Sequence, residues 1–293
     1  MPRGLDHVVH AVRNLDAAAD LYRRLGFTVG PRNRHPWGTH NNIVQLPGFF
    51  IELLAVVEPD KLGGEGIAEL FGRFNQRFLQ SQEGLSFLML ESPLAGADAR
   101  DFGVAGIALS SAQRFEREGK AADGSPVTLG FSLAFARDGR APQIGFATCQ
   151  QLNSQSFWNP ALQQHRNGAS AIAGAVIVAE NPSDHHIFLS AFTGERELNA
   201  TSGAVTARTP RGDLSVMDDA AFRSHFGVAP PDLSGGARLA AIRFAVREQG
   251  VLTATLTAGE ISHATHMGQV VVPPQAAMGA TLVFASAGGG ANS

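Results

Sequence analysis

The sequence predicts an α+β fold assembled from tandem β-α-β-β-β modules. Residues 4–57 run through one strand, one amphipathic helix and three further strands, separated by short polar or glycine-containing turns. Shifting this pattern by about 80 positions lays Gly26-Phe27 on Gly106-Ile107, and the same order of elements returns. A third copy begins at Ala171, and a fourth follows it. Repetition of one supersecondary unit therefore indicates the fold class.

The first strand is expected over residues 5–12, where side chains alternate between two faces. One face carries Leu5, His7, Val9 and Ala11, and the opposite face carries Asp6, Val8, His10 and Val12. The alternation therefore separates His7 from both of its polar neighbours, Asp6 and His10.

The rest of the first module is a helix and three strands. Asp16 is expected to cap a helix over residues 17–25, which Gly26 ends. Within that helix Asp20 is four positions before Arg24, the spacing of a stabilising ion pair. The three strands are expected at residues 27–29, 42–46 and 49–57, with a polar loop from 31 to 40 between the first two.

The later modules are expected to repeat this order. The second has a strand at 84–91, a helix over 93–106 and strands at 107–110, 127–136 and 143–150. The third has a strand from 171, a helix from Ser183 to Gly194 and strands at 204–208 and 214–217. The fourth has strands at 239–246, 269–272 and 280–285, and its threonine-rich middle predicts a poor helix. Residues 59–82 form a helical insert that packs across an edge or joins two units, and residues 158–168 form a linker.

The composition bounds the class of protein. The chain has 293 residues, 44% of them hydrophobic and 17% charged, with a net charge of −3. This balance is that of a globular protein without the basic excess that nucleic-acid binding needs. Its one cysteine excludes an intrachain disulfide. The start of the chain lacks the apolar stretch of a signal peptide, and no stretch is long enough to span a membrane, so we expect a soluble cytoplasmic protein.

Glu52 is the candidate catalytic residue. It stands between FFI and LLAVV, in a strand whose two faces are both expected to be covered. A carboxylate there is costly unless it is paired, metal-bound or protonated. Two interpretations stay open: Glu52 lies on a wetter face and bonds an arginine or the backbone, or it projects into a curved sheet toward a metal or a substrate proton.

His7 is the expected companion of Glu52. It lies in the first strand of the module that the Glu52 strand ends. If these strands are neighbours, the two side chains share one cavity, and an imidazole with a carboxylate suits Zn, Fe(II), Mn or Ni. The alternative is a core histidine whose hydrogen bonds are satisfied within the protein.

The stretches LDHVVHAVRNLDAAADLYRRLGF, GTHNNIVQL and FFIELLAV resemble a glyoxalase-like module of the vicinal oxygen chelate (VOC) superfamily. The resemblance extends to residue 168 through GFSLAFARD and FWNPALQQHRNGA, and beyond 169 it rests on the order of modules. It implies that paired modules wrap a cup-shaped half-barrel. Two such domains are expected, at 1–168 with the insert near 59–82, and at 169–286, before a disordered tail at 287–293.

The resemblance also implies metal ligands on the first and last strands of each module. The first module supplies His7 and Glu52. The second departs from the pattern, because Phe87 stands at the histidine position and residues 147–151 offer no carboxylate; Ala175 and Ala241 stand there in the later modules. One divalent metal (Zn, Fe, Mn or Ni) would then take a third ligand from water, Gln150, Gln151, His165 or His40; otherwise the cup is metal-free. No nucleotide cofactor is expected.

Polar side chains beside an aromatic ring are the candidate substrate-binding groups. They lie in the loop around Trp37, on the 143–150 strand and in the 158–168 linker. The candidates are His35, Trp37, Thr39, His40, Asn42, Gln150, Trp158 and His165. The alternative for the loop is an ordinary polar surface. Cys149 is expected to be an inert buried thiol rather than a nucleophile.

Two functions stay open, beside a third option of a structural scaffold in which Glu52 is merely paired and no deep pocket lies beside His7. The resemblance implies an enzyme acting on a small oxygenated organic substrate in the N-terminal cup, of lyase, isomerase or dioxygenase type, with Glu52 as ligand or base and His7 as ligand. The alternative is a metal-free module that sequesters a small molecule, as bleomycin resistance members of the superfamily do. Either function predicts a small-molecule partner, with no nucleic acid and no membrane, and leaves a homodimer open.

Overall fold

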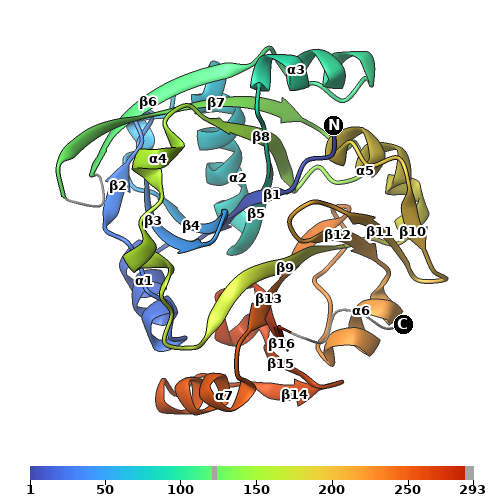
Figure 1. Ribbon diagram of the computed structural model, residues 1–293. Coiled ribbons are helices and arrows are strands. Elements are labelled where there is room, and N and C mark those ends of the chain that lie inside the picture. The colour runs from blue at the N-terminus through green and yellow to red at the C-terminus, as the bar shows by residue number, and fades with distance from the viewer. Residues whose placement is uncertain (121–123, 288–293) are drawn as a thin grey trace.

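The chain forms two mixed β-sheets of eight strands each, as the computed structural model shows (Figure 1). The structure describes residues 1–120 and 124–287. The strand order is β2-β3-β4-β1-β5-β8-β7-β6 in the first sheet and β10-β11-β12-β9-β13-β16-β15-β14 in the second. The predicted α+β fold of paired modules is confirmed. The predicted disordered tail falls at 288–293 outside the described residues.

The first half contains two modules and an insert. The first module consists of β1 (Leu5–Ala11), α1 (Leu15–Arg24), β2 (Arg32–Arg34), β3 (Thr39–Leu46) and β4 (Phe49–Val56). The insert consists of η1 (Pro59–Lys61), η2 (Ala68–Arg73) and α2 (Phe74–Ser81). The second module consists of β5 (Gly84–Glu91), α3 (Ala95–Val104), β6 (Gln113–Lys120), β7 (Pro126–Ala136) and β8 (Gly145–Gln151). Two short turns, α4 (Ser154–Phe157) and η3 (Pro160–Gln163), lead to the second half.

The second half repeats this plan. Its third module consists of β9 (Ala169–Val178), η4 (Pro182–His185), α5 (His186–Thr193), β10 (Leu198–Ala200), β11 (Ala204–Arg208) and β12 (Asp213–Met217). After α6 (Asp219–Phe226), the fourth consists of β13 (Arg238–Val246), α7 (Gln249–Ala258), β14 (Ala264–His266), β15 (Gln269–Val272), η5 (Pro274–Ala276) and β16 (Thr281–Ser286). In the described residues no helix is both long enough and apolar enough to cross a membrane.

The pairing of β1 explains how His7 and Glu52 come together. β1 runs parallel to β4, with His7 opposite Phe50 and Val9 opposite Glu52. On its other side β1 runs antiparallel to β5, which joins the two modules into one curved sheet. The first and last strands of the module are therefore neighbours, which is the condition under which His7 and Glu52 can share one cavity.

The insert packs inside the curve of the first sheet rather than across its edge (Figure 1). Phe71 of η2 and Phe78 of α2 are buried. The hydroxyl of Ser86 on β5 donates to Oδ1 of the buried Asn75 at 2.6 Å, which fixes α2 to the sheet. The insert thereby closes one side of the cup.

The two halves share one apolar core on the faces of the sheets that carry α1, α3, α5 and α7. Phe146 of β8 packs at 4.6 Å between ring centroids on Phe188 of α5. Phe27, just after α1, packs on Phe244 of β13 at 5.5 Å. The predicted boundary at 168/169 therefore falls within a continuous core, and the two domains remain our proposal for dividing the chain.

The first helix differs from the prediction in its N-cap and in its ion pair, and agrees with it at its end. Asn14, not Asp16, caps α1, because its Oδ1 accepts from the Ala17 backbone nitrogen. Asp20 pairs with Arg23, not Arg24. The predicted helix end at Gly26 is right, since this glycine adopts a φ of 88°.

Three strand and helix predictions are wrong. Residues 27–29 form no strand, because the Thr28 backbone nitrogen donates to Nδ1 of His165 instead of to a neighbouring strand. Residues 107–110 contribute one isolated bridge, and the strand that follows α3 is β6. The threonine-rich stretch does form α7, whose Thr253 and Thr255 hydroxyls donate to carbonyls one turn earlier.

Phe87 occupies the place on β5 where the superfamily pattern would put a histidine. Its ring lies over Gly145, its parallel partner on β8, so closely that a Cβ added at that glycine would lie 2.2 Å from the ring. We expect Gly145→Ala to lower the free energy of unfolding by ~1–3 kcal/mol, because the buried ring must move. Urea unfolding measures it. Gly103→Ala, where the added Cβ meets nothing within 4 Å, is the matched control; equal stabilities for the two variants would contradict this packing.

Candidate functional site

A bulge in β1 brings Asp6 beside His7. Pairing with β5 passes from Leu5–Leu90 directly to His7–Met89, so Asp6 is the extra residue. The predicted alternation is therefore wrong at this end of the strand: Leu5 packs in the core shared by the two halves, with Val8, and not on the His7 side. The Asp6 carboxylate lies next to the His7 imidazole.

Three contacts fix the His7 ring. Its Nδ1 donates to Asp6 Oδ2 at 2.5 Å, and Asp6 Oδ1 accepts from Nε2 of Gln151 at 3.0 Å. The imidazole stacks on Phe50 with centroids 4.1 Å apart and an interplanar angle of 14°. Because Nδ1 carries the shared proton, Nε2 of the neutral ring is an acceptor, and His7 lines the cavity described below.

Glu52 lies on β4 across the same cavity and is 4% exposed. Its Oε1 accepts from Asn41 Nδ2 at 2.5 Å and lies 3.7 Å from Nε2 of His35. Burial raises the pKa of the Glu52 carboxyl, while His7, Asn41 and Arg117 act in the opposite direction. Desolvation is the largest of these effects, so the protonated carboxyl is favoured.

A chain of amide side chains links Glu52 to Arg117. Asn41, which donates to Glu52, accepts at its Oδ1 from Nδ2 of Asn33 at 3.0 Å. Asn33 Oδ1 in turn accepts from Nη1 of Arg117 at 3.1 Å. Every amide in this chain both donates and accepts, which fixes its orientation. Arg117 therefore stands near Glu52 without a direct ion pair to it among the described residues.

His35 and Trp37 form one wall of the cavity. Their rings stack with centroids 4.7 Å apart, and Nδ1 of His35 donates to Thr39 Oγ1 at 2.9 Å. Burial, together with the charges of Arg117, His40 and His7, lowers the pKa of His35 to about 3. His35 is therefore a neutral imidazole at neutral pH, and its Nε2 accepts from Asn41 at 3.4 Å.

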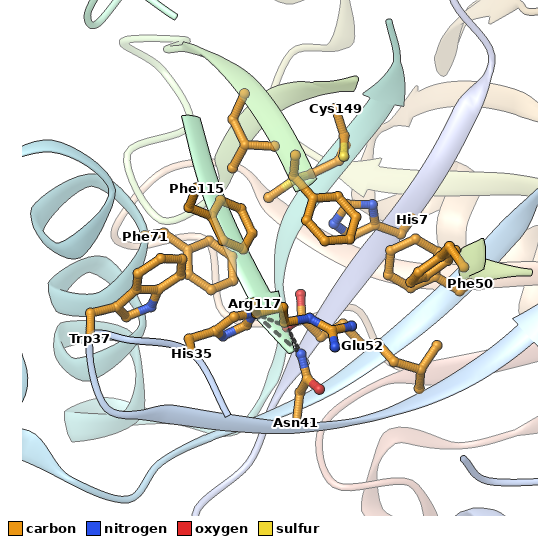
Figure 2. Close-up of a pocket in the computed structure, with 15 residues that line it drawn as sticks. His7, His35, Trp37, Asn41, Phe50, Glu52, Phe71, Phe115, Arg117 and Cys149 are labelled. Atoms are coloured by element: carbon orange, nitrogen blue, oxygen red, sulfur yellow. Dashed lines mark hydrogen bonds and ion pairs between the residues drawn. The ribbon is translucent and has the colours of Figure 1, made fainter. Parts of the chain in front are cut away.

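These residues line one narrow cavity within the first sheet (Figure 2). The volume in which the centre of a water molecule can lie is about 40 Å³. This is room for a few waters or for the flat part of a small molecule. The walls are mainly aromatic and apolar, and the polar groups are His7, His35, Asn41, Glu52 and Arg117 with the Cys149 thiol. The apolar lining consists of Trp37, Ile43, Phe50, Phe71, Met89, Phe115, Phe131, Leu133 and Phe157.

The positions implied for a metal by the superfamily do not form a sufficient donor set. His7 and Glu52 line the cavity, but Phe87 fills the β5 position that corresponds to His7. The β8 position that corresponds to Glu52 is Ala147, which pairs with Met89. Glu52 is not part of any group of three close ligand atoms in the described part of the chain. Such a group does form from Asp6, His7 and Cys149, whose ligand atoms lie within 4.8 Å of one another. Burial raises the pKa of Cys149 well above its ordinary value, so the thiol keeps its proton.

The structure brings some of the predicted residues to the cavity and places others elsewhere. His7, Glu52, His35 and Trp37 line it, and Thr39 lies directly behind His35. The other candidates make contacts away from it: His40 with Glu58, Asn42 with Gly30, Gln150 with Ala95 and His165 with Thr28 and Gln45. Trp158 packs edge-on against Phe50, one layer outside. His10 bonds Tyr22 and Met278 in the core.

Alternation explains these placements on β3. Thr39, Asn41 and Ile43 face the cup, whereas His40 and Asn42 point to the opposite side. Asn41 and not the predicted Asn42 lines the cavity, because the register between the two strands is not visible in the sequence. Ile43 of β3 pairs with Glu52 of β4. Asn41 lies two residues before Ile43 and therefore on the same face of the sheet, so an alignment of these two strands would have identified it.

Two further residues of the site escaped the sequence analysis. Arg117 and Phe115 lie on β6, in a stretch for which the sequence analysis predicts no strand. The signal was present, since QRFEREGK places Phe115 and Arg117 two apart, with Glu116 and Glu118 on the other face. The strand is hard to recognise because this stretch has low hydrophobicity.

Similarity to known proteins agrees with this architecture. A family model described as a glyoxalase-like domain matches residues 5–193. A hypothetical protein from Staphylococcus aureus has a similar structure (TM-score 0.68, 13% identity, 97% of this chain and 99% of that one). So does the Mn(II)-bound glyoxalase from Novosphingobium aromaticivorans (0.60, 10%, 98% and 83%). A mutant of 4-hydroxymandelate synthase from Streptomyces coelicolor follows (0.54, 10%, 91% and 78%). No curated protein sequence matches the chain.

Proposed function

The chain belongs to the glyoxalase-like domain family of the VOC superfamily, and on that premise we propose that its N-terminal cup catalyses proton transfer on a small oxygenated organic molecule, as an isomerase or a lyase does. The observation that carries the proposal is the pair of oriented acid–base groups on opposite sides of one cavity. His7 is held by Asp6, and Glu52 is held by Asn41 (Figure 2). The environments of the two groups differ, which suits opposite roles.

His7 is the base in this proposal. Asp6 fixes the tautomer and stabilises the imidazolium that forms when Nε2 takes a proton from carbon or oxygen next to a carbonyl group. The stacking on Phe50 keeps the ring from rotating. The base is thus aimed at one point in the cavity.

Glu52 is the acid. Burial raises the pKa of its carboxyl and so favours the protonated form, whose proton can be delivered to the substrate oxygen or to the far carbon. The Asn41 amide holds one carboxyl oxygen, and this leaves the other for the substrate. After these steps His7 carries one extra proton and Glu52 lacks one. Both groups return to their starting states when a proton passes from His7 to Glu52 through the bound molecule or through water. The aromatic walls limit that water to a few molecules.

Deuterium exchange tests this proposal without knowledge of the natural substrate. Wild type, Glu52→Gln and the control Glu58→Gln are incubated in D₂O with a panel of small aryl ketones and α-hydroxy ketones, with and without a carboxyl group. We expect saturable, enzyme-dependent incorporation next to the carbonyl by wild type and the control, measured by NMR. Glu58 bonds His40 and Lys61 outside the cavity. Binding without exchange would support the sequestering function instead.

Metal dependence separates this mechanism from that of a metalloenzyme. Because the described donors at the superfamily positions are too few, we expect EDTA to leave the exchange unchanged. Zn²⁺ should inhibit it, since thiolate, imidazole and carboxylate donors suit zinc and binding to the Asp6–His7–Cys149 group would remove the base. Cys149→Ser should relieve this inhibition, as isothermal titration and the exchange assay can show. Loss of exchange in EDTA with recovery in Mn²⁺ or Fe²⁺ would make the acid–base proposal wrong.

A further inference from the structure

Arg117 is a buried cation whose charge no described carboxylate neutralises directly. The residue is 8% exposed, and no acidic oxygen of the described residues lies within ion-pair distance of it. A buried guanidinium without a counter-charge is expensive, and the cost falls when an anion binds.

Among the described residues, hydrogen-bond acceptors hold one nitrogen of this guanidinium. Nη1 donates to Asn33 Oδ1 at 3.1 Å and to the Glu118 carbonyl at 3.2 Å. The Phe131 ring lies 5.8 Å from the guanidinium carbon and supports its face. Nε and Nη2 form the other edge, and neither donates to an acceptor among the described residues. Such an edge offers two parallel N–H groups, the arrangement that binds a carboxylate in bidentate fashion.

Arg117 also stands where the surface meets the cavity. A surface groove runs between β2 and β6, and the residues that line both this groove and the inner cavity are His35 and Arg117. Arg32 and Arg34 line the groove as further cations, and Glu116 and Glu118 line it as well. An anionic molecule that enters by this route reaches Arg117 before it reaches His7 and Glu52.

The other polar groups of the cavity are neutral or internally paired. His35 is a neutral imidazole, the Glu52 carboxyl favours its protonated form, and His7 shares its proton with Asp6. Among the described residues that line the cavity, Arg117 is the one arginine or lysine. The space beyond it is narrow and lined by aromatic rings.

We propose that Arg117 determines substrate specificity by binding a carboxylate, so that the substrate is a small carboxylic acid with a flat apolar body. This inference rests on the proposed function of the cup and adds the chemical class of its substrate. The carboxylate pairs with the free edge of Arg117, the apolar body lies against Trp37, Phe115 and Phe131, and the reacting carbon lies between His7 and Glu52.

Binding of phenylacetate and of its uncharged analogue phenylacetamide tests the proposal. Trp37 lines the cavity and the chain has two tryptophans, so a Trp158→Phe background reports binding through Trp37 fluorescence alone. We expect the carboxylate to bind about 10- to 100-fold more tightly than the amide, the range of one charge-assisted bidentate contact. This comparison needs no change at Arg117.

Variants on β6 then assign the preference. Arg117→Met should abolish it, and Arg117→Lys should restore only part of it, since lysine keeps the charge without the planar fork. Arg114→Met is the matched control on the same strand, because Arg114 is exposed and pairs with Glu116 at 2.8 Å. Equal binding of acid and amide by wild type, or an unchanged preference in Arg117→Met, overturns the inference.

The same titrations separate this inference from the proposed function. Glu52→Gln should keep the preference for phenylacetate while losing exchange. If exchange persists in wild type but phenylacetate has no advantage, the substrate class is wrong and the acid–base function stands. If the preference is present and no carbonyl compound exchanges, Arg117 is a binding residue of a cup that does not catalyse proton transfer. Absence of binding by both probes overturns the inference.

Discussion

Glu52→Gln is expected to slow enzyme-dependent deuterium exchange by about 100- to 10,000-fold, the usual contribution of a positioned general acid or base. Glutamine has nearly the same shape, and its oxygen can still accept from Asn41 Nδ2, so the amide chain to Arg117 survives. What disappears is the exchangeable proton on the carboxyl. The change therefore removes chemistry while it leaves the walls of the cavity in place.

The same substitution should stabilise the protein. Burial raises the pKa of Glu52 in the folded state, so the folded protein holds this proton more tightly than the unfolded chain does. A contribution of this sign is present at low pH and is lost as the pH rises through the raised pKa. The advantage of Glu52→Gln over wild type in the free energy of unfolding should therefore grow between acidic and alkaline pH, as urea unfolding at several pH values can measure.

Opposite changes in activity and stability distinguish a functional carboxyl from a structural one. If Glu52 served only to bond Asn41, glutamine would leave exchange intact. If Glu52 anchored the fold through an ion pair, glutamine would destabilise it. A variant that is both less stable than wild type at neutral pH and fully active would contradict the role proposed here on both counts.

The modular fold was predictable because its signals are local. The strand at Gly84–Glu91 and the strand that contains Glu52 are apolar runs with clear ends, and parallel pairing of the first and last strands of a module brings His7 and Glu52 into one cavity. A helix-stopping glycine such as Gly26 is visible without any tertiary information.

The remainder of the site depends on features that single residues do not reveal. The bulge at Asp6 moves a carboxylate to the side of His7, and strict alternation predicts the reverse. The choice of Asn41 over Asn42 is a matter of register between β3 and β4. Arg117 reaches Asn33 across 84 positions of sequence, and the polar strand that carries it has no apolar run to mark it.

His35 should make the protein acid-sensitive. Its pKa is about 3 in the folded state, against an ordinary value of 6.5. Because the unfolded chain binds the proton more tightly, the stability that the neutral ring provides is fully present above pH 6.5 and is lost as the pH falls toward the folded-state pKa. At about 1.4 kcal/mol for each unit of pKa difference, the loss over that range is on the order of 4 kcal/mol.

His35→Gln is the variant that isolates this effect. Glutamine can keep hydrogen bonds to Thr39 and Asn41 but cannot take up a proton, so its free energy of unfolding should fall less steeply below pH 6.5 than that of wild type. The comparison also cancels Glu52, whose raised pKa acts with the opposite sign in both proteins. His186→Gln is the control, because His186 is exposed and bonds only the Ser183 carbonyl in the described structure. Parallel pH profiles for wild type and His35→Gln would show that the His35 ring, which stacks on Trp37, takes up protons readily in the folded state. The description of a narrow aromatic cavity that admits only a few waters, on which the proposed chemistry depends, would then be wrong.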